Sequence, residues 1–483
     1  MSDKEERRMR SIDIIVIVVY MFGMLGIGFY ARGKINNMDD FILGGKRFTV
    51  FPLTATIMTT MTGAGMTLGM VGAVFKRGSG IMWDLTGVAI GLFAMALIAA
   101  KLRETNKRSL AEVIAGSSGP KPQIAVAIVA MFYTLVLTGQ NIAAVGRLLN
   151  YIGADVGITS TQATVISAIV LTLYTSLGGL YAVVWTDFIQ FIIMFVSAVA
   201  IGPLLAVFAS GGIVPIAETL SSKSLSLFNP FVGNAVWPSL TFALLMLLGV
   251  PGDPTAPQRA LAAHDSSVAK KAFTYAGISV FIWGIALTII GGAALHLMPN
   301  LAEEWGTAEA AFPVFAMKFF PPVIAGLTFA GMLAAVMSSA DSMLLLCTTH
   351  LVYDIGMNLV PNVLTEKKVV KMLPWVTAFL GFFALFIALR ISSLLSTLYF
   401  VFSMVSAAFI VPMVAQLYFP KKCTAFGVTS AVLVGGGITT LMYYIGVMGP
   451  GGDPVYTGMT ASILCIILGS FAKKNRTIEN RHD

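Results

Sequence analysis

Long apolar runs follow one another along almost the whole chain and are separated by short polar loops. In a helix, which rises 1.5 Å per residue, roughly 20 apolar residues cross the hydrocarbon core of a bilayer, about 30 Å thick. We count about thirteen such runs and predict an all-α integral membrane protein without a large soluble domain. The runs are 11–32, 51–75, 80–100, 123–151, 157–176, 179–208, 236–258, 269–297, 319–351, 369–390, 393–419, 424–447 and 454–472.

The second run is interrupted by TTMTGAGMTLG, residues 59–69. Backbone groups that face lipid must be satisfied within their own helix, so a broken helix is tolerated only beside protein or a water-filled cavity. Gly63 and Gly65 permit unusual backbone angles, and the threonine hydroxyls can satisfy freed backbone groups. Close packing of helices through small residues is the alternative explanation of this stretch taken alone.

The seventh run contains a second interruption, LLGVPGDPTAPQ, residues 247–258. No unbroken helix is expected through this many prolines and glycines. Each interrupted run opens a group of five spans, and paired breaks at matching positions are typical of inverted-repeat transporters that bind their substrate at the breaks. We therefore predict a 5+5 core with halves of opposite topology.

The predicted organisation has three parts. An N-terminal helix and loop occupy 1–50, and the inverted-repeat transport core occupies 51–419, with halves at 51–208 and 236–419. Two accessory helices and a cytoplasmic tail occupy 420–483. The first apolar run follows a charged decapeptide and lacks a small-residue cleavage site, so we expect a retained helix rather than a signal peptide.

Composition and charge agree with a membrane location. The chain of 483 residues is 57% hydrophobic and only 11% charged, too little polar surface for soluble domains. The net charge of +8 raises the possibility of nucleic-acid binding, but the basic residues fall in alternating loops, as the positive-inside rule expects. We predict a multi-pass protein of the cell membrane with its N-terminus outside and its C-terminus in the cytoplasm. No nucleic-acid partner and no obligate protein partner is expected, and Arg259 is grouped with the cytoplasmic charges.

The ninth run carries polar residues deep in an apolar helix, in LAAVMSSADSMLLL, residues 333–346. Ala335, Ser338, Ser339 and Ser342 are spaced i, i+3, i+4 and i+7, so they share one face of the helix. Backbone carbonyl and hydroxyl oxygens on this face suit a hard cation such as sodium, and carbonyls freed by the first break can complete the shell. Hydrogen bonding between helices is the commoner use of serine in membranes. The predicted main sodium site comprises Thr59, Thr62, Ala335, Ser338 and Ser339.

Two carboxylates lie deep inside long apolar runs, away from the breaks. Asp341 lies on the edge of the polar face of the ninth run, and Asp187 lies in VVWTDFIQF of the sixth, a run with no neighbouring Lys or Arg. Ionisable residues within the membrane are costly and mark functional sites. Two acids without a basic partner predict a second cation site or a proton site, with Ser342 as a further ligand.

The solute is expected between the two breaks. Gln140 and Asn141 of the fourth run are candidate contacts, although cross-linking of helices is the alternative for each. Asp253 lies in the second break itself, and Gly63, Ala64 and Gly65 border the first. No P-loop, HExxH or GxSxG motif is found, so we do not expect an enzyme.

Four stretches give the chain a family resemblance. They are FILGGKRF, YTSLGGLYAVVWTDFIQ, PQRALAAHDSSVAKKA and AAVMSSADS. Together with the spans they resemble the sodium:solute symporter family, which includes sodium/glucose, sodium/proline and choline transporters. The resemblance covers nearly the whole chain. It implies sodium-coupled transport and a main sodium site at the Ala335 carbonyl, the Ser338 and Ser339 hydroxyls and two facing threonine carbonyls.

The resemblance also implies departures from the family pattern. A second sodium site, present in some members, would use Asp187 with Ser342 and Asp341, where relatives often have serine. The aromatic cage of the choline branch is not kept, because the corresponding positions hold Met61, Leu137 and Asp253. Asp253 favours an amino group on the solute or, alternatively, caps a half-helix.

These observations predict a symporter that uses sodium to import a small polar organic solute, such as an amino acid, amine, vitamin or carboxylate, by alternating access. Proton coupling through Asp187 and Asp341 is the first alternative. The second is a membrane sensor, since the fold resembles the input module of some histidine kinases. Only about a dozen residues follow Phe471, without an output domain, so we expect a transporter.

Overall fold

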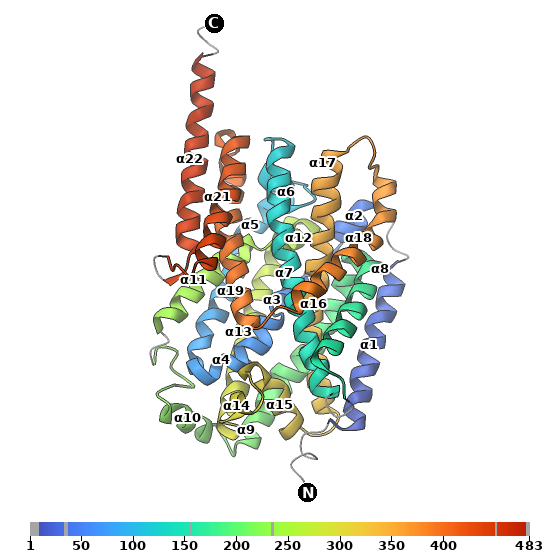
Figure 1. Ribbon diagram of the computed structural model, residues 1–483, viewed down its shortest axis with the longest axis vertical. Coiled ribbons are helices and arrows are strands. Elements are labelled where there is room, and N and C mark those ends of the chain that lie inside the picture. Colours follow the sequence, from blue (N-terminus) through green and yellow to red (C-terminus); the bar gives the residue numbers. More distant parts are fainter. Residues whose placement is uncertain (1–8, 33–36, 154–156, 233–235, 450–451, 480–483) are drawn as a thin grey trace.

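The computed structural model describes residues 9–32, 37–153, 157–232, 236–449 and 452–479. Within these residues the chain is an elongated bundle of helices, in which α1 begins at one end and α22 ends at the other (Figure 1). Nine helices of the described part are long and apolar enough to cross a membrane, and four further apolar helices are shorter. The all-α membrane fold is thus confirmed, whereas the count of thirteen spans stays a prediction.

The first predicted half begins at the first break. Gly179, with φ 55° and ψ −165°, divides α8 into two helical parts, where the sequence predicts the boundary between two spans. The helices of this half are α3 (Val50–Met61), α4 (Met70–Arg77), α5 (Met82–Glu104), α6 (Leu110–Ala115), α7 (Pro120–Gly153), α8 (Ser160–Met194) and α9 (Gly202–Ala209), and α10 (Ile213–Ser222) lies between the two halves.

The second predicted half begins at the second break. Its helices are α11 (Val236–Gly252), α12 (Thr255–Ala262), α13 (Ser266–Leu297), α14 (Leu301–Glu304), α15 (Ala311–Phe319), α16 (Ile324–Thr349), α17 (Met357–Leu359), α18 (Glu366–Ala388), α19 (Leu394–Val405) and α20 (Val411–Tyr418). Outside both halves lie α1 (Ser11–Arg32), α2 (Met38–Leu43), α21 (Ala425–Tyr444) and α22 (Val455–Glu479).

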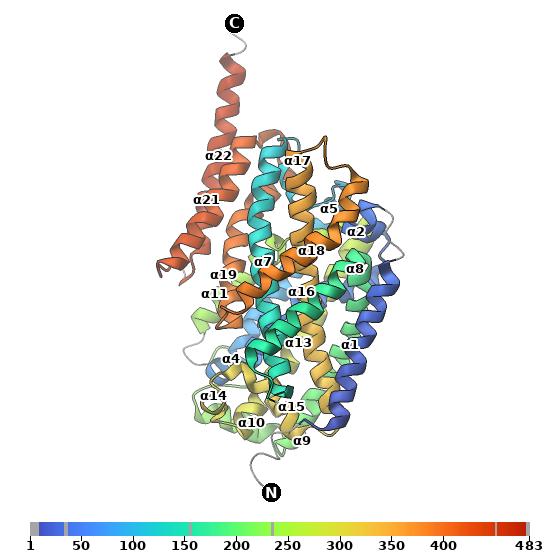
Figure 2. The same cartoon turned by 45° about the vertical axis from the view of Figure 1, so that its right-hand side comes forward.

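Equivalent helices of the two halves pack against each other. The second long helix of each half, α5 and α13, are in contact, and so are the third long helices, α7 and α16. The most apolar stretch of α16 is entirely buried, and this helix runs through the middle of the bundle beside α7, α8 and α1 (Figure 2). Polar side chains on α16 are therefore held away from lipid.

The basic loops gather at one end of the bundle. At the end of α5, Arg103 donates hydrogen bonds to the carbonyls of Ala263 (2.6 Å) and His264 (3.2 Å) ahead of α13. Arg108 pairs with Asp39 of α2 (2.6 Å) and Glu366 of α18 (2.8 Å). Loops that the charge pattern assigns to one side of the membrane thus contact one another. That this side faces the cytoplasm stays a prediction.

Candidate cation and solute site

The first break separates α3 from α4. Thr62 leaves the helix with φ −103° and ψ 34°, and a π-helical turn, Gly65–Gly69, leads into α4. The freed N–H of Ala64 donates to the Asn141 side chain of α7 at 3.1 Å. A Cβ atom added to Gly63 would lie 2.5 Å from Ser339 Oγ, so glycine is needed for this close approach. The predicted interruption is confirmed, and it faces protein rather than lipid.

Four predicted sodium ligands meet where α3 lies against α16. The Ser338 hydroxyl lies 3.2 Å from the Thr59 carbonyl oxygen and 3.0 Å from that of Ala335. The Ser339 hydroxyl lies 3.4 Å and 3.3 Å from the same two carbonyl oxygens. We call these two carbonyl and two hydroxyl oxygens the main oxygen group. They provide the neutral, hard ligands that a small cation prefers.

The fifth predicted ligand is placed differently. The Thr62 carbonyl accepts the hydroxyl of Thr67 at 2.5 Å across the break. The carbonyl that approaches the main oxygen group is that of Thr60, which lies 2.7 Å from Ser339 Oγ. A sequence pattern does not separate these two carbonyls, because the backbone direction changes at Thr62 itself.

The two intramembrane carboxylates are buried near this group, and one prediction about them is wrong. The sequence places Arg259 with the cytoplasmic charges and leaves Asp187 and Asp341 without a basic partner. Arg259 is instead only 1% exposed, and its guanidinium interacts electrostatically with both carboxylates. It also donates to Ser342, the third predicted ligand of the second cation site, at 2.5 Å. All eight residues of α12, the helix that follows the second break, are buried in the bundle, a placement that the sequence does not display.

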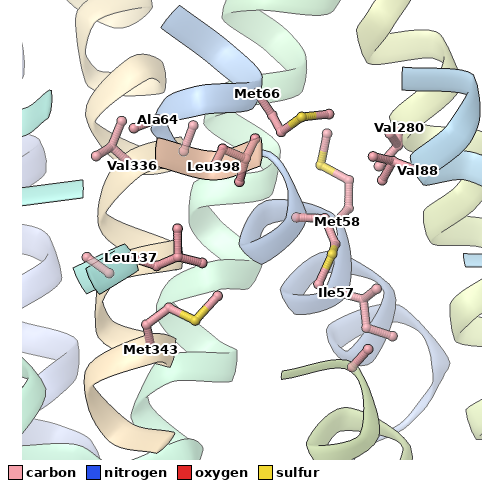
Figure 3. Close-up of a cluster of buried hydrophobic side chains, with 14 of the residues drawn as sticks. Ile57, Met58, Ala64, Met66, Val88, Leu137, Val280, Val336, Met343 and Leu398 are labelled. Atoms are coloured by element: carbon pink, nitrogen blue, oxygen red, sulfur yellow. The ribbon is translucent and has the colours of Figure 1, made fainter. Parts of the chain in front are cut away.

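A small cavity lies between the two breaks. Its free volume is about 20 Å³, which is room for about one water molecule. Figure 3 shows Ala64 of the first break together with Leu137, Met343 and Leu398, side chains from three other helices that line the cavity. All six predicted solute contacts and Ser339 also line it, so the structure brings them together: Gly63, Ala64, Gly65, Gln140, Asn141 and Asp253.

The polar side chains of this cavity already bond to backbone. Gln140 donates to the Leu394 carbonyl of α19, and Asn141 donates to the Leu137 carbonyl at 2.8 Å while accepting from Ala64. Both side chains therefore link α7 to another helical segment, which is the alternative role considered for them from the sequence. Because each also lines the cavity, bonding to backbone and contact with a solute are compatible.

Asp253 lies at the second break. The helix α11 ends at Gly252, and the Asp253 carboxylate accepts the N–H of Thr255 at 2.8 Å at the start of α12. The predicted interruption is confirmed, and the carboxylate bonds to the first N–H of α12 from the residue before the N-cap, Pro254. A carboxylate at a helix N-terminus also gains from the helix dipole, which lowers the cost of its burial.

One ion pair lies beyond the cavity, toward the end that holds α14 and α15. Arg147 of α7 pairs with Glu309 and donates to the Ile391 carbonyl at 3.0 Å, and Glu309 accepts the N–H of Leu394 at 2.8 Å. Arg147 follows Gln140 by seven residues, about 10 Å along the helix. The pair ties α7 to the start of α19 on this side of the cavity.

A multi-pass helical bundle with two broken helices around a small cavity, beside hard oxygen ligands, defines the class of inverted-repeat membrane transporters. The model of the sodium:solute symporter family matches residues 41–435. The chain belongs to this family, which implies sodium as its coupling ion.

Curated relatives and a solved structure agree with this assignment. The sodium/pantothenate symporter of Haemophilus influenzae is 26% identical over 446 residues, 90% of each chain. The sodium/proline symporter of Escherichia coli is 28% identical over 376 residues, 74% of this chain and 73% of that protein. A substrate-bound, outward-open Na⁺-coupled sialic acid symporter has a TM-score of 0.79 at 19% identity and covers 95% of this chain and 98% of its own. This last likeness concerns the fold.

Proposed function

We propose that this protein uses sodium to import a small polar organic solute across the cell membrane by alternating access. The observation that carries the proposal is the meeting of both helix breaks at one cavity that adjoins the main oxygen group. Ser339 belongs to both, since its hydroxyl is part of the oxygen group and it lines the cavity. An ion and a solute bound there share a residue.

Sodium would bind in the main oxygen group, formed by Thr59, Ala335, Ser338 and Ser339. The two carbonyls come from α3 and α16, so a bound ion joins a broken helix to the central helix. This joining stabilises the arrangement of the first break that shapes the solute cavity. The linkage is reciprocal, so the solute raises the affinity for sodium by the same factor.

The cavity constrains the solute. Its lining is largely apolar, with Met61, Met66, Leu137 and Phe402, and Asp253 is its one charged residue within the described chain. An amino group on the solute would complement this carboxylate. The named relatives are sodium/pantothenate and sodium/proline symporters. Both of these solutes have a carboxylate, and proline has an amino group as well, so a solute with a carboxylate and no amino group is the competing class; its negative charge would need the nearby sodium as partner.

Alternating access requires the cavity to open to one side at a time. The Arg147–Glu309 pair provides closure toward the α14 and α15 end. With the N-terminus outside, as we propose, this end is extracellular, and the pair would close the cavity on that side. Breaking and forming this pair would accompany each transport cycle.

The proposal is tested with purified protein in two stages. Thermal stability is measured against amino acids, amines, vitamins and carboxylates, each in sodium and in potassium, because a ligand of the folded state raises apparent stability. The stabilising solute is then taken up into proteoliposomes under an inward sodium gradient or an inward proton gradient without sodium. We expect stabilisation and accumulation that depend on sodium. Accumulation driven by protons alone would replace sodium by proton coupling, and absence of any solute-dependent uptake would contradict transport.

A further inference from the structure

A buried guanidinium occupies the position that the sequence assigns to a second cation. Arg259 of α12 reaches across to α3 and α16, and its Nη2 atom donates to the hydroxyls of Ser342 (2.5 Å), Thr60 (3.3 Å) and Thr56 (3.4 Å). Its Nη1 atom donates to Gln258 Oε1 at 2.7 Å. At 1% exposure, this charge has left water entirely.

Single hydroxyl groups connect this cation to two carboxylates. The Thr56 hydroxyl, which accepts from Arg259, donates to Asp187 Oδ2 at 2.5 Å. The Ser342 hydroxyl, which also accepts from Arg259, donates to Asp341 Oδ1 at 3.4 Å. Because a buried charge is tolerated only when it is compensated, these links explain why the arginine and both acids remain inside the bundle.

We propose that Arg259 is the resident cation of the second site, so that the chain binds one sodium ion, in the main oxygen group. This inference rests on the proposed function. Counted over Asp187, Asp341 and Arg259, two carboxylates and one guanidinium leave one negative charge, which one sodium ion compensates. Asp253, which bonds to the start of α12, is counted separately. The main oxygen group consists of neutral ligands, so this residual charge is the source of its electrostatic attraction for the ion.

The two sites are close enough for this effect. The carbonyl of Thr60 accepts from Ser339 of the main oxygen group, while the hydroxyl of the same residue accepts from Arg259. Asp187 bonds to Thr56, one helical turn from Thr60. At an effective dielectric of about 20, one unit charge within about 10 Å changes ion affinity roughly tenfold or more.

A sodium ion bound in addition to the arginine is the competing arrangement. Asp187 Oδ1 is buried without a hydrogen-bond partner among the described residues, and this oxygen is where such an ion would bind. A third carboxylate, Asp253, also interacts electrostatically with Arg259; it bonds to the Thr255 N–H and is present unchanged in every variant below. Counting bound ions separates the two arrangements.

The experiment is equilibrium binding of radioactive ²²Na⁺ to the purified chain without solute, at constant ionic strength. We expect one ion per wild-type chain. Arg259→Gln leaves two uncompensated carboxylates and should bind two ions, whereas Arg259→Lys should bind one. Asp187→Asn removes the residual charge and should weaken binding roughly tenfold. The double variant Asp187→Asn/Arg259→Gln has the wild-type charge sum and should recover single-ion binding near the wild-type affinity.

The outcomes are distinguishable. Two ions per wild-type chain, reduced to one by Asp187→Asn, would overturn this inference and leave the proposed function intact. No binding to the wild type would contradict the proposed main sodium site instead. If Arg259→Gln does not fold, the double variant still decides, because a purely structural role of Arg259 predicts no recovery of affinity when both charges are removed.

Discussion

Removal of the two hydroxyl ligands from α16 is the sharpest test of the main oxygen group. In Ser338→Ala/Ser339→Ala, an ion would lose two of the oxygens that surround the proposed site. A polar contact to a charged group contributes about 1.5–3 kcal/mol, so sodium affinity should fall on the order of a hundredfold or more. The same hydroxyls make hydrogen bonds within the membrane, worth about 0.6 kcal/mol each, so the fold should survive.

The assay is thermal unfolding of the detergent-purified protein in sodium and in potassium. At a sodium concentration of about 100 times its Kd, the wild type gains about 2.7 kcal/mol of stability. A hundredfold weaker variant at that concentration gains only about 0.4 kcal/mol. The matched control is Thr349→Val on the same helix, whose buried hydroxyl bonds to the Leu345 carbonyl at 2.9 Å. If the double variant keeps the full sodium response, the assignment of Ser338 and Ser339 is refuted.

Three further predictions concern the breaks and the closure. Gly63→Ala places a Cβ atom 2.5 Å from Ser339 Oγ and should lower the sodium affinity, measured by titration, at least tenfold. The control Gly437→Ala, with no atom within 4 Å of the added carbon, should leave the affinity unchanged, and equal responses of the two variants would contradict the close packing. Glu309→Gln removes the ion pair with Arg147 and should open the cavity to water. In a chain without native cysteines, a cysteine placed in the cavity by Leu137→Cys should then react severalfold faster with a water-soluble thiol reagent. Glu218→Gln on α10 is its control, and unchanged labelling would show that the pair does not hold the cavity closed. Asp253→Asn keeps a side-chain oxygen for the Thr255 N–H but removes the charge, so in the thermal assay it should weaken binding of an amine solute about tenfold or more and leave binding of a carboxylate solute unchanged. The opposite pattern would exclude an amino group of the solute at Asp253.

The sequence predicts the fold class and much of the site because both depend on local rules. A bilayer requires long apolar runs, and a break inside such a run requires glycine, proline or hydroxyl groups, so both interruptions are visible as letters. Helical periodicity places Ala335, Ser338 and Ser339 on one face. The structure adds that Thr59 lies opposite this face, a partner that the position of the first break already indicates.

The residues that the sequence misjudges depend on contacts between helices. Thr62 and Thr60 are both near the break, but the turn of the backbone directs the Thr62 carbonyl to Thr67 and that of Thr60 to Ser339. Thr56, Thr59 and Thr60 are spaced i, i+3 and i+4 and so form a polar face on α3, in addition to the one on α16. This spacing is the signal that could have been found in the sequence. A hydroxyl face on α3 together with a buried Asp187 predicts a hydrogen bond between the two, as Thr56 makes in the structure.

The sequence by itself determines a membrane-embedded bundle with two broken helices and a cation-binding face, because apolar length, helix-breaking residues and helical spacing act within each segment. Only the tertiary structure decides where the charges lie. Arg259 follows a break whose angle no local pattern specifies, and the packing of α12 against α3 and α16 carries its guanidinium between Asp187 and Asp341. Charge compensation is a sum over groups distant in sequence, so it exists only once the helices are packed.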